Sequence, residues 1–122
     1  MRILLVDDEV ELVSTLAERL ELRGMDADWQ ETAAGAIEAA GKQSYAIAVL
    51  DVKLPGASGL ELRVRLEQMQ PEMKFIFVTG HGCEEAFEQG REAAGCEYYL
   101  VKPVSIELLV SKIEDVLGKK AR

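Results

Sequence analysis

The chain has 122 residues, of which 48% are hydrophobic and 30% are charged, and its formal net charge is −8. This composition fits one globular domain with a single core and excludes a disordered chain. The acidity argues against a nucleic-acid ligand, because contacts to phosphates need a basic face, and no apolar run is long enough to insert into a membrane.

The first half of the chain alternates apolar runs with segments of helical periodicity. The predicted elements are, in order, a strand at 2–6, a helix from Val10 that is stopped by Gly24, a half-exposed edge strand at 26–30, and a helix capped by Thr32 and closed by Gly41. The first strand is a continuous apolar run, which is typical of a strand buried on both faces.

The second half repeats this alternation, with proline and glycine at the turns. In order, the predicted elements are a central strand at 46–50, a loop at 52–59, a helix capped by Ser58 that includes Leu60, Val64 and Met69, a strand at 74–78, a turn at 79–82, a helix at 84–94, a strand at 98–101, and a helix capped by Ser105 and ended by Gly118. We therefore expect one domain at 1–118, followed by a basic tail or the start of a linker at 119–122.

Five repeats of strand and helix are typical of a parallel sheet with helices on both faces. The strand order 2-1-3-4-5 fits five strands best, which predicts a doubly wound α/β fold, a flavodoxin-like (βα)5 three-layer sandwich. In such a sheet, ligands bind where the strands end. The polar residues that directly follow four of the apolar runs are Asp7-Asp8, Asp51, Thr79 and Lys102.

Two features concern the compartment of the protein. Met1 and Arg2 lead directly into the first apolar run, which leaves no room for a signal peptide. Cys83 and Cys96 have neither metal spacing nor the pattern of a disulfide framework, so we interpret them as reduced thiols. Both features predict a cytoplasmic protein.

Asp7, Asp8 and Asp51 follow the two strands that flank the switch point of the predicted sheet, so their carboxylates should lie close together. Like charges at short distance oppose ionisation unless a cation is present. Mg²⁺ suits such a site, and the backbone carbonyl of Lys53 could add a ligand. The alternative is that Asp7 and Asp8 only cap the first helix, which would leave Asp51 unexplained.

Lys102 leaves the last predicted strand and can reach over the carboxylates to pair with an anion such as phosphate. Pro103 fixes the turn that follows and is a candidate for a cis peptide bond. Thr79, at the end of the fourth strand, offers a hydroxyl to the same anion. Each residue alone could be an ordinary surface or strand-end residue.

These motifs resemble the receiver domain of two-component response regulators, and the resemblance covers essentially the whole chain. The matching residues are Asp7-Asp8, Asp51, Thr79, Lys102-Pro103, the loop at 54–60 and the turn at 79–82. The resemblance implies a phosphoprotein in signal transduction whose phosphoacceptor is Asp51.

By the same resemblance, Asp8 and Asp51 would bind Mg²⁺ directly and Asp7 would act mainly through water. Lys102 would pair with the phosphoryl group, and Thr79 would donate a hydrogen bond to it. Tyr99 matches the aromatic switch residue that turns inward on activation.

The resemblance also implies the partners. A sensor histidine kinase or a histidine phosphotransfer protein would supply the phosphoryl group. The face formed by the helix at 84–94, the strand at 98–101 and the last helix would then change for a downstream output protein or domain, or for a phosphorylation-dependent dimer. The domain would be a switch that catalyses its own phosphorylation and slow dephosphorylation, and not an enzyme with a separate substrate.

Two alternatives remain at this point. The first is a receiver-like interaction module that works independently of phosphorylation. The second is a Mg²⁺-dependent phosphatase, which would need a general acid two residues after Asp51, where this chain has Lys53. The same lysine could alter the lifetime of the phosphoryl group.

Overall fold

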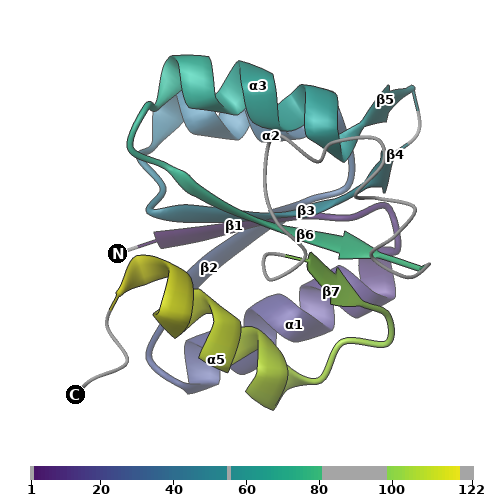
Figure 1. The fold of residues 1–122 in the computed structure, drawn as a ribbon, viewed down its shortest axis with the longest axis vertical. Helices are drawn as coiled ribbons and strands as arrows, with labels where there is room; N and C mark the ends of the chain where they lie inside the picture. The colour runs from purple at the N-terminus through teal and green to yellow at the C-terminus, as the bar shows by residue number, and fades with distance from the viewer. Residues whose placement is uncertain (1, 55, 81–98, 119–122) are drawn as a thin grey trace.

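A computed structural model describes residues 2–54, 56–80 and 99–118, and it is built around one parallel sheet (Figure 1). The strands of this sheet are β1 (Arg2–Val6), β2 (Asp26–Gln30), β3 (Ile47–Asp51), β6 (Lys74–Thr79) and β7 (Tyr99–Val101). Their order is β2-β1-β3-β6-β7, and every neighbouring pair is parallel. Counted over these five strands, this is the predicted order 2-1-3-4-5, so the prediction of a doubly wound α/β fold is confirmed.

Helices cover both faces of the sheet (Figure 1). The helices of one face are α1 (Val10–Leu22) and α5 (Ile106–Leu117), and those of the other are α2 (Ala33–Lys42) and α3 (Gly59–Met69). The sheet therefore separates two apolar cores. One contains Leu5, Leu20 and Leu109, and the other contains Leu50 and Phe77.

The predicted helix starts are confirmed by capping hydrogen bonds. The side chains of Thr32, Ser58 and Ser105 accept bonds from the N–H groups of Gly35, Glu61 and Leu108, respectively. At its other end α5 is closed by Gly118, whose φ of 72° lies in the left-handed region that glycine adopts without strain.

Two local predictions are wrong. Helix α2 continues through Gly41 to Lys42, because one glycine inside a helix costs only about 1 kcal/mol and the hydrogen bond from the N–H of Gln43 to the carbonyl of Ala39 is kept. The loop at 52–59 contains an antiparallel hairpin of β4 (Lys53–Leu54) and β5 (Ala57–Ser58). Helix α3 includes Leu60, Val64 and Met69, as predicted. It buries Leu62 and Leu66, whereas Val64 and Met69 are exposed, because its first turn packs on β3 through Gly59.

The strand ends also shift slightly: β3 includes Asp51 and β6 includes Thr79, because both residues still pair with the neighbouring strand. Predictions for 81–98 and for 119–122 lie outside the described residues. They concern part of the predicted turn, the predicted helix at 84–94, Tyr98, both cysteines and the basic tail. Within the part of the chain that the structure describes, every helix is too short or too polar to cross a membrane.

Candidate functional site

The carboxyl ends of four strands deliver polar side chains to one edge of the sheet. Asp7 follows β1, Asp51 ends β3, Thr79 ends β6 and Lys102 follows β7. The N–H of Lys102 donates to the carbonyl of Thr79 at 2.8 Å, which ties the last two strand ends together. The structure thus brings together the residues that the sequence placed at separate strand ends.

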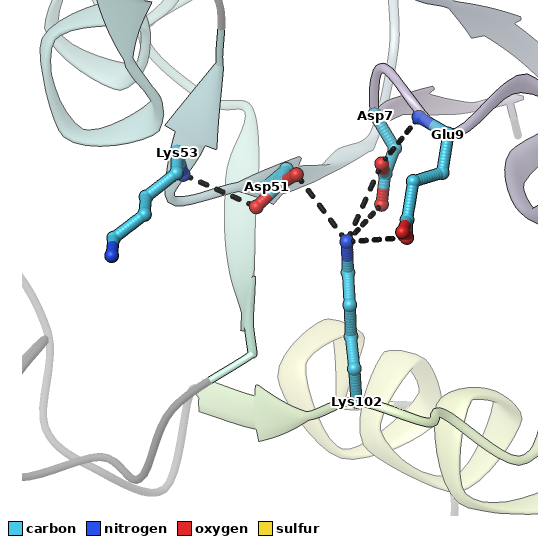
Figure 2. A network of polar contacts seen from close by, with 5 residues as sticks. All are labelled: Asp7, Glu9, Asp51, Lys53 and Lys102. Atoms are coloured by element: carbon cyan, nitrogen blue, oxygen red, sulfur yellow. Dashed lines mark hydrogen bonds and ion pairs between the residues drawn. The ribbon is translucent and has the colours of Figure 1, made fainter.

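The ammonium of Lys102 lies at the centre of the site (Figure 2). Its Nζ is 2.8 Å from Glu9 Oε1, 3.2 Å from Asp7 Oδ2 and 3.4 Å from Asp51 Oδ2. The side chain of Lys102 is only 19% exposed, and those of Asp7 and Asp51 are 9% and 7% exposed. One half-buried positive charge is therefore shared among several carboxylates.

Burial raises the pKa of Asp51, and the charge of Asp7 raises it further. The hydrogen bond from the N–H of Lys53 and the charge of Lys102 act in the opposite direction without cancelling the rise. For Lys102, burial alone would lower the pKa, but the hydrogen bond to Glu9 and the charges of Asp7 and Asp51 outweigh it and raise the pKa. Lys102 is therefore positively charged at neutral pH. Its single charge does not balance the several carboxylates around it, so the site has an excess of negative charge.

The three aspartates fit a divalent cation. Asp7, Asp8 and Asp51 each offer a carboxylate oxygen, and these oxygens lie within 4.8 Å of one another. Oxygen donors of this kind suit hard cations such as Mg²⁺ and Ca²⁺, and Asp8 is the exposed member of the cluster. The N–H of Lys53 donates to Asp51 Oδ1 at 3.1 Å, which orients this carboxylate, while a ligand role for the carbonyl of Lys53 stays a prediction.

The main chain around Asp51 is closely packed. A Cβ at Gly59 would collide with the carbonyl of Asp51, and the N–H of Gly59 donates to the carbonyl of Val52 at 2.7 Å. Because α3 begins at Gly59, its first turn fixes the end of β3 and with it the position of the Asp51 side chain.

The structure describes some of the other predicted site residues in full and one only in its main chain. Thr79 is buried, and its strand pairs with β3, so that Asp51 lies opposite Val78. The bond between Lys102 and Pro103, a candidate for a cis peptide bond, is cis in the structure. The main chain of Tyr99 lies in β7, but its side chain lies outside the described residues, so its switch role stays a prediction.

Sequence reasoning missed Glu9 as a member of the site. It stands at the N-cap of α1 directly after the two aspartates, where an acidic residue is ordinarily explained by the helix dipole. Its side chain makes no capping bond and contacts Lys102 instead. The only signal in the sequence is the acidic run Asp7-Asp8-Glu9 opposite a lysine at another strand end.

Comparison with known proteins identifies the family. The family model for the response regulator receiver domain matches residues 3–114. A curated relative, the uncharacterized transcriptional regulatory protein YesN of Bacillus subtilis, is 32% identical over 127 residues, which cover 99% of this chain and 33% of YesN. The response regulator receiver protein CpdR of Brucella abortus is 28% identical over 116 residues, covering 95% of this chain and 96% of CpdR.

Solved structures agree with the sequence matches. A CheY-like receiver domain protein from Methanospirillum hungatei superposes with a TM-score of 0.82 at 30% identity, covering 98% of this chain and 95% of that one. A response regulator from Burkholderia pseudomallei, solved with a phosphorylated aspartic acid, a calcium ion and citrate, gives a TM-score of 0.81 at 26% identity, with 97% and 69% covered. This chain spans between 33% and 52% of the length of the first five curated relatives. By fold, site and sequence, the chain belongs to the receiver domain family of two-component response regulators.

Proposed function

We propose that this receiver domain accepts a phosphoryl group on Asp51 from the phosphohistidine of a sensor histidine kinase or a histidine phosphotransfer protein. The observation that carries the proposal is that the Asp51 carboxylate lies close both to other carboxylates and to an ammonium group. Its carboxylate lies in the cluster formed with Asp7 and Asp8 and is also 3.4 Å from the ammonium of Lys102. Such an arrangement can hold a cation at the acceptor and neutralise the charge of an incoming phosphoryl group.

In the proposed reaction, an oxygen of Asp51 attacks phosphorus and forms an acyl phosphate. The phosphorus–nitrogen bond of the donor breaks, and its electron pair leaves with the imidazole nitrogen. A Mg²⁺ ion held by Asp7, Asp8, Asp51 and the carbonyl of Lys53 would neutralise charge on the phosphoryl oxygens. Lys102 pairs with the same oxygens, and Thr79 donates a hydrogen bond. Water later attacks the acyl phosphate, which releases phosphate and restores the carboxylate.

Phosphorylation adds up to about two negative charges at Asp51. In the proposal Thr79 moves toward them, Tyr99 turns inward, and the face that includes β7 and α5 binds a partner differently. A signal passes only if that partner binds the two states with different affinity. Dimerisation through this face is one such output.

The names of the relatives suggest the output partners of this domain. Several relatives carry names of transcriptional regulatory proteins, and PhoB of Pseudomonas aeruginosa is 32% identical over 119 residues, which cover 96% of this chain and 52% of PhoB. We therefore propose a receiver domain at 1–118 that acts in the cytoplasm on an output domain or a separate output protein, without itself binding nucleic acid or inserting into a membrane. A module that works independently of phosphorylation is not favoured, since a neighbour with this fold carries a phosphorylated aspartic acid.

The proposal is tested by intact-mass spectrometry after incubation with acetyl phosphate or phosphoramidate. We expect the mass of one phosphoryl group to appear with Mg²⁺ and to be absent with a chelator. The Asp51→Asn protein, which keeps an acceptor for the N–H of Lys53, should not gain this mass. Phosphorylation of Asp51→Asn at the wild-type level would exclude Asp51 as the acceptor.

A further inference from the structure

Glu9 makes the shortest polar contact of the Lys102 ammonium. The distance from Nζ to Glu9 Oε1 is 2.8 Å, compared with 3.2 Å to Asp7 Oδ2 and 3.4 Å to Asp51 Oδ2. Figure 2 shows Asp7 and Glu9 on one side of the ammonium and Asp51 on the other. In the unphosphorylated site Lys102 therefore lies closer to the acidic residues at the end of β1 than to the proposed acceptor, which it also contacts.

The placement of Glu9 is specific and does not follow from a capping role. Glu9 is the N-cap residue of α1, but its side chain makes no capping hydrogen bond. Its N–H donates to Asp7 Oδ1 at 2.9 Å, which fixes the main chain of Glu9 beside the acidic cluster. The carboxylate is thus held where it can reach Lys102 and is available for that contact.

The contact with Glu9 opposes the contact that phosphorylation requires. In the proposed function Lys102 pairs with the phosphoryl oxygens on Asp51, so its ammonium must give up or weaken its closest present partner. The side chain of Glu9 is 58% exposed, and ion pairs at such positions are weak. Glu9 can therefore adjust the balance between the two states without locking Lys102 in place.

We propose that Glu9 is a positioning residue that restrains Lys102 in the unphosphorylated state and thereby limits how strongly the phosphorylated state is favoured. The inference rests on the proposed function of Asp51 and Lys102, and it adds a residue of this chain that acts on the reaction only through Lys102. It predicts that loss of the Glu9 carboxylate makes the phosphorylated form more favourable.

The test measures binding of beryllofluoride, a stable analogue of the phosphoryl group, by 19F NMR at saturating Mg²⁺. Glu9→Gln should bind beryllofluoride about two- to fivefold more tightly than wild type, the range expected for an exposed ion pair. Glu11→Gln is the matched control, because it removes the same charge from the exposed first turn of α1, and it should bind like wild type. An unchanged or weaker affinity of Glu9→Gln would overturn the proposal.

A double-mutant cycle separates an effect through Lys102 from a general effect of charge. In a Lys102→Met background, the further change Glu9→Gln should leave the affinity unchanged, and an equal gain in both backgrounds would overturn the proposal. Glu9→Asp keeps the charge but moves the carboxylate away from Lys102 by one methylene. This variant should therefore bind beryllofluoride as tightly as Glu9→Gln does. Wild-type affinity of Glu9→Asp would overturn the proposal, even if the Lys102 variants do not fold. If wild type itself binds no beryllofluoride, the proposed function fails, which is a distinct result.

Discussion

Two networks built around aspartates differ in their balance of charge. At the carboxyl edge of the sheet, the carboxylates of Asp7, Glu9 and Asp51 share the single ammonium of Lys102. Beside α2, the single carboxylate of Asp28 receives three donors. These are Arg2 Nη1 at 3.1 Å, the hydroxyl of Tyr45 at 2.8 Å and Gln43 Nε2 at 3.2 Å.

The Asp28 network is complete without any further ligand. Burial raises the pKa of Tyr45 to about 12, with the hydrogen bond and charge of Asp28 adding to the rise and Arg2 opposing it, so the hydroxyl remains a donor. The network joins β1, β2 and the segment before β3, which makes it part of the scaffold. The Lys102 network instead keeps an excess of negative charge, which a divalent cation would balance in the proposed function.

Removal of Lys102 should have the largest effect on stability. Lys102→Met leaves the carboxylates of Asp7 and Asp51 buried without a positive partner, and we expect a loss of about 2 kcal/mol in the free energy of unfolding without divalent cation. Urea unfolding with a chelator and with Mg²⁺ measures this loss. Mg²⁺ should restore most of it, because the cation replaces the missing charge. A loss that is the same with and without Mg²⁺ would show that the excess negative charge is not the cause.

In the Asp28 network, Tyr45→Phe should cost about 1 kcal/mol, the usual value of one hydrogen bond, since Asp28 keeps its contacts with Arg2 and Gln43. The rate of phosphorylation by acetyl phosphate should not change. Urea unfolding and mass spectrometry on the same protein test both statements. A slower phosphorylation with normal stability would contradict the division into scaffold and site.

Asp51→Asn should stabilise the protein at neutral pH in the presence of a chelator, by roughly 1 kcal/mol for the removal of one like-charge contact. Because the pKa of Asp51 is raised in the folded protein, the native state binds this proton more tightly than the unfolded state. Stability is therefore lost as pH rises from the ordinary aspartate value through the raised pKa.

The advantage of Asp51→Asn should accordingly shrink as pH falls toward the ordinary aspartate pKa. Thermal unfolding of both proteins over the acidic to neutral range measures it. A variant that is less stable than wild type at neutral pH would mean that Lys102 and the N–H of Lys53 stabilise the Asp51 carboxylate more than burial and Asp7 destabilise it.

The smallest effect is expected for Lys53→Met. The contact of Lys53 with Asp51 is made by its N–H, and Figure 2 shows its side chain turned away from that carboxylate. The free energy of unfolding should stay within about 0.5 kcal/mol of wild type. A larger loss in the free energy of unfolding, measured in urea, would show that the side chain of Lys53 supports the site in addition to its main chain.

The sheet and most of the site were predictable from the sequence, because the apolar runs mark the strands and the polar residues that follow them mark the site. Buried strands are continuous apolar runs, and in a parallel sheet the residues that follow them meet at one edge, which brings Asp7, Asp51, Thr79 and Lys102 together. The helix starts were also predictable, because Thr32, Ser58 and Ser105 are local signals.

Contacts that depend on side-chain reach were not predictable. Nothing in the sequence distinguishes an acidic N-cap residue such as Glu9 from a partner of Lys102, which lies 93 positions further along the chain. Likewise, the bond between Tyr45 and Asp28 joins residues 17 positions apart and exists only because of how the sheet and α2 pack. The continuation of α2 past Gly41 was missed because the helix tolerates the modest cost of one glycine.

In the proposed function the phosphoryl group is carried by Asp51 and by no other acidic residue of the cluster. Sodium borohydride reduces an acyl phosphate to the alcohol, which converts a phosphorylated aspartate into homoserine and marks its position permanently. After phosphorylation with acetyl phosphate and Mg²⁺, reduction and proteolysis, peptide mass spectrometry should find homoserine at position 51 alone. Homoserine at position 7 or 8, or none in a protein that has gained the phosphoryl mass, would exclude Asp51 as the single acceptor.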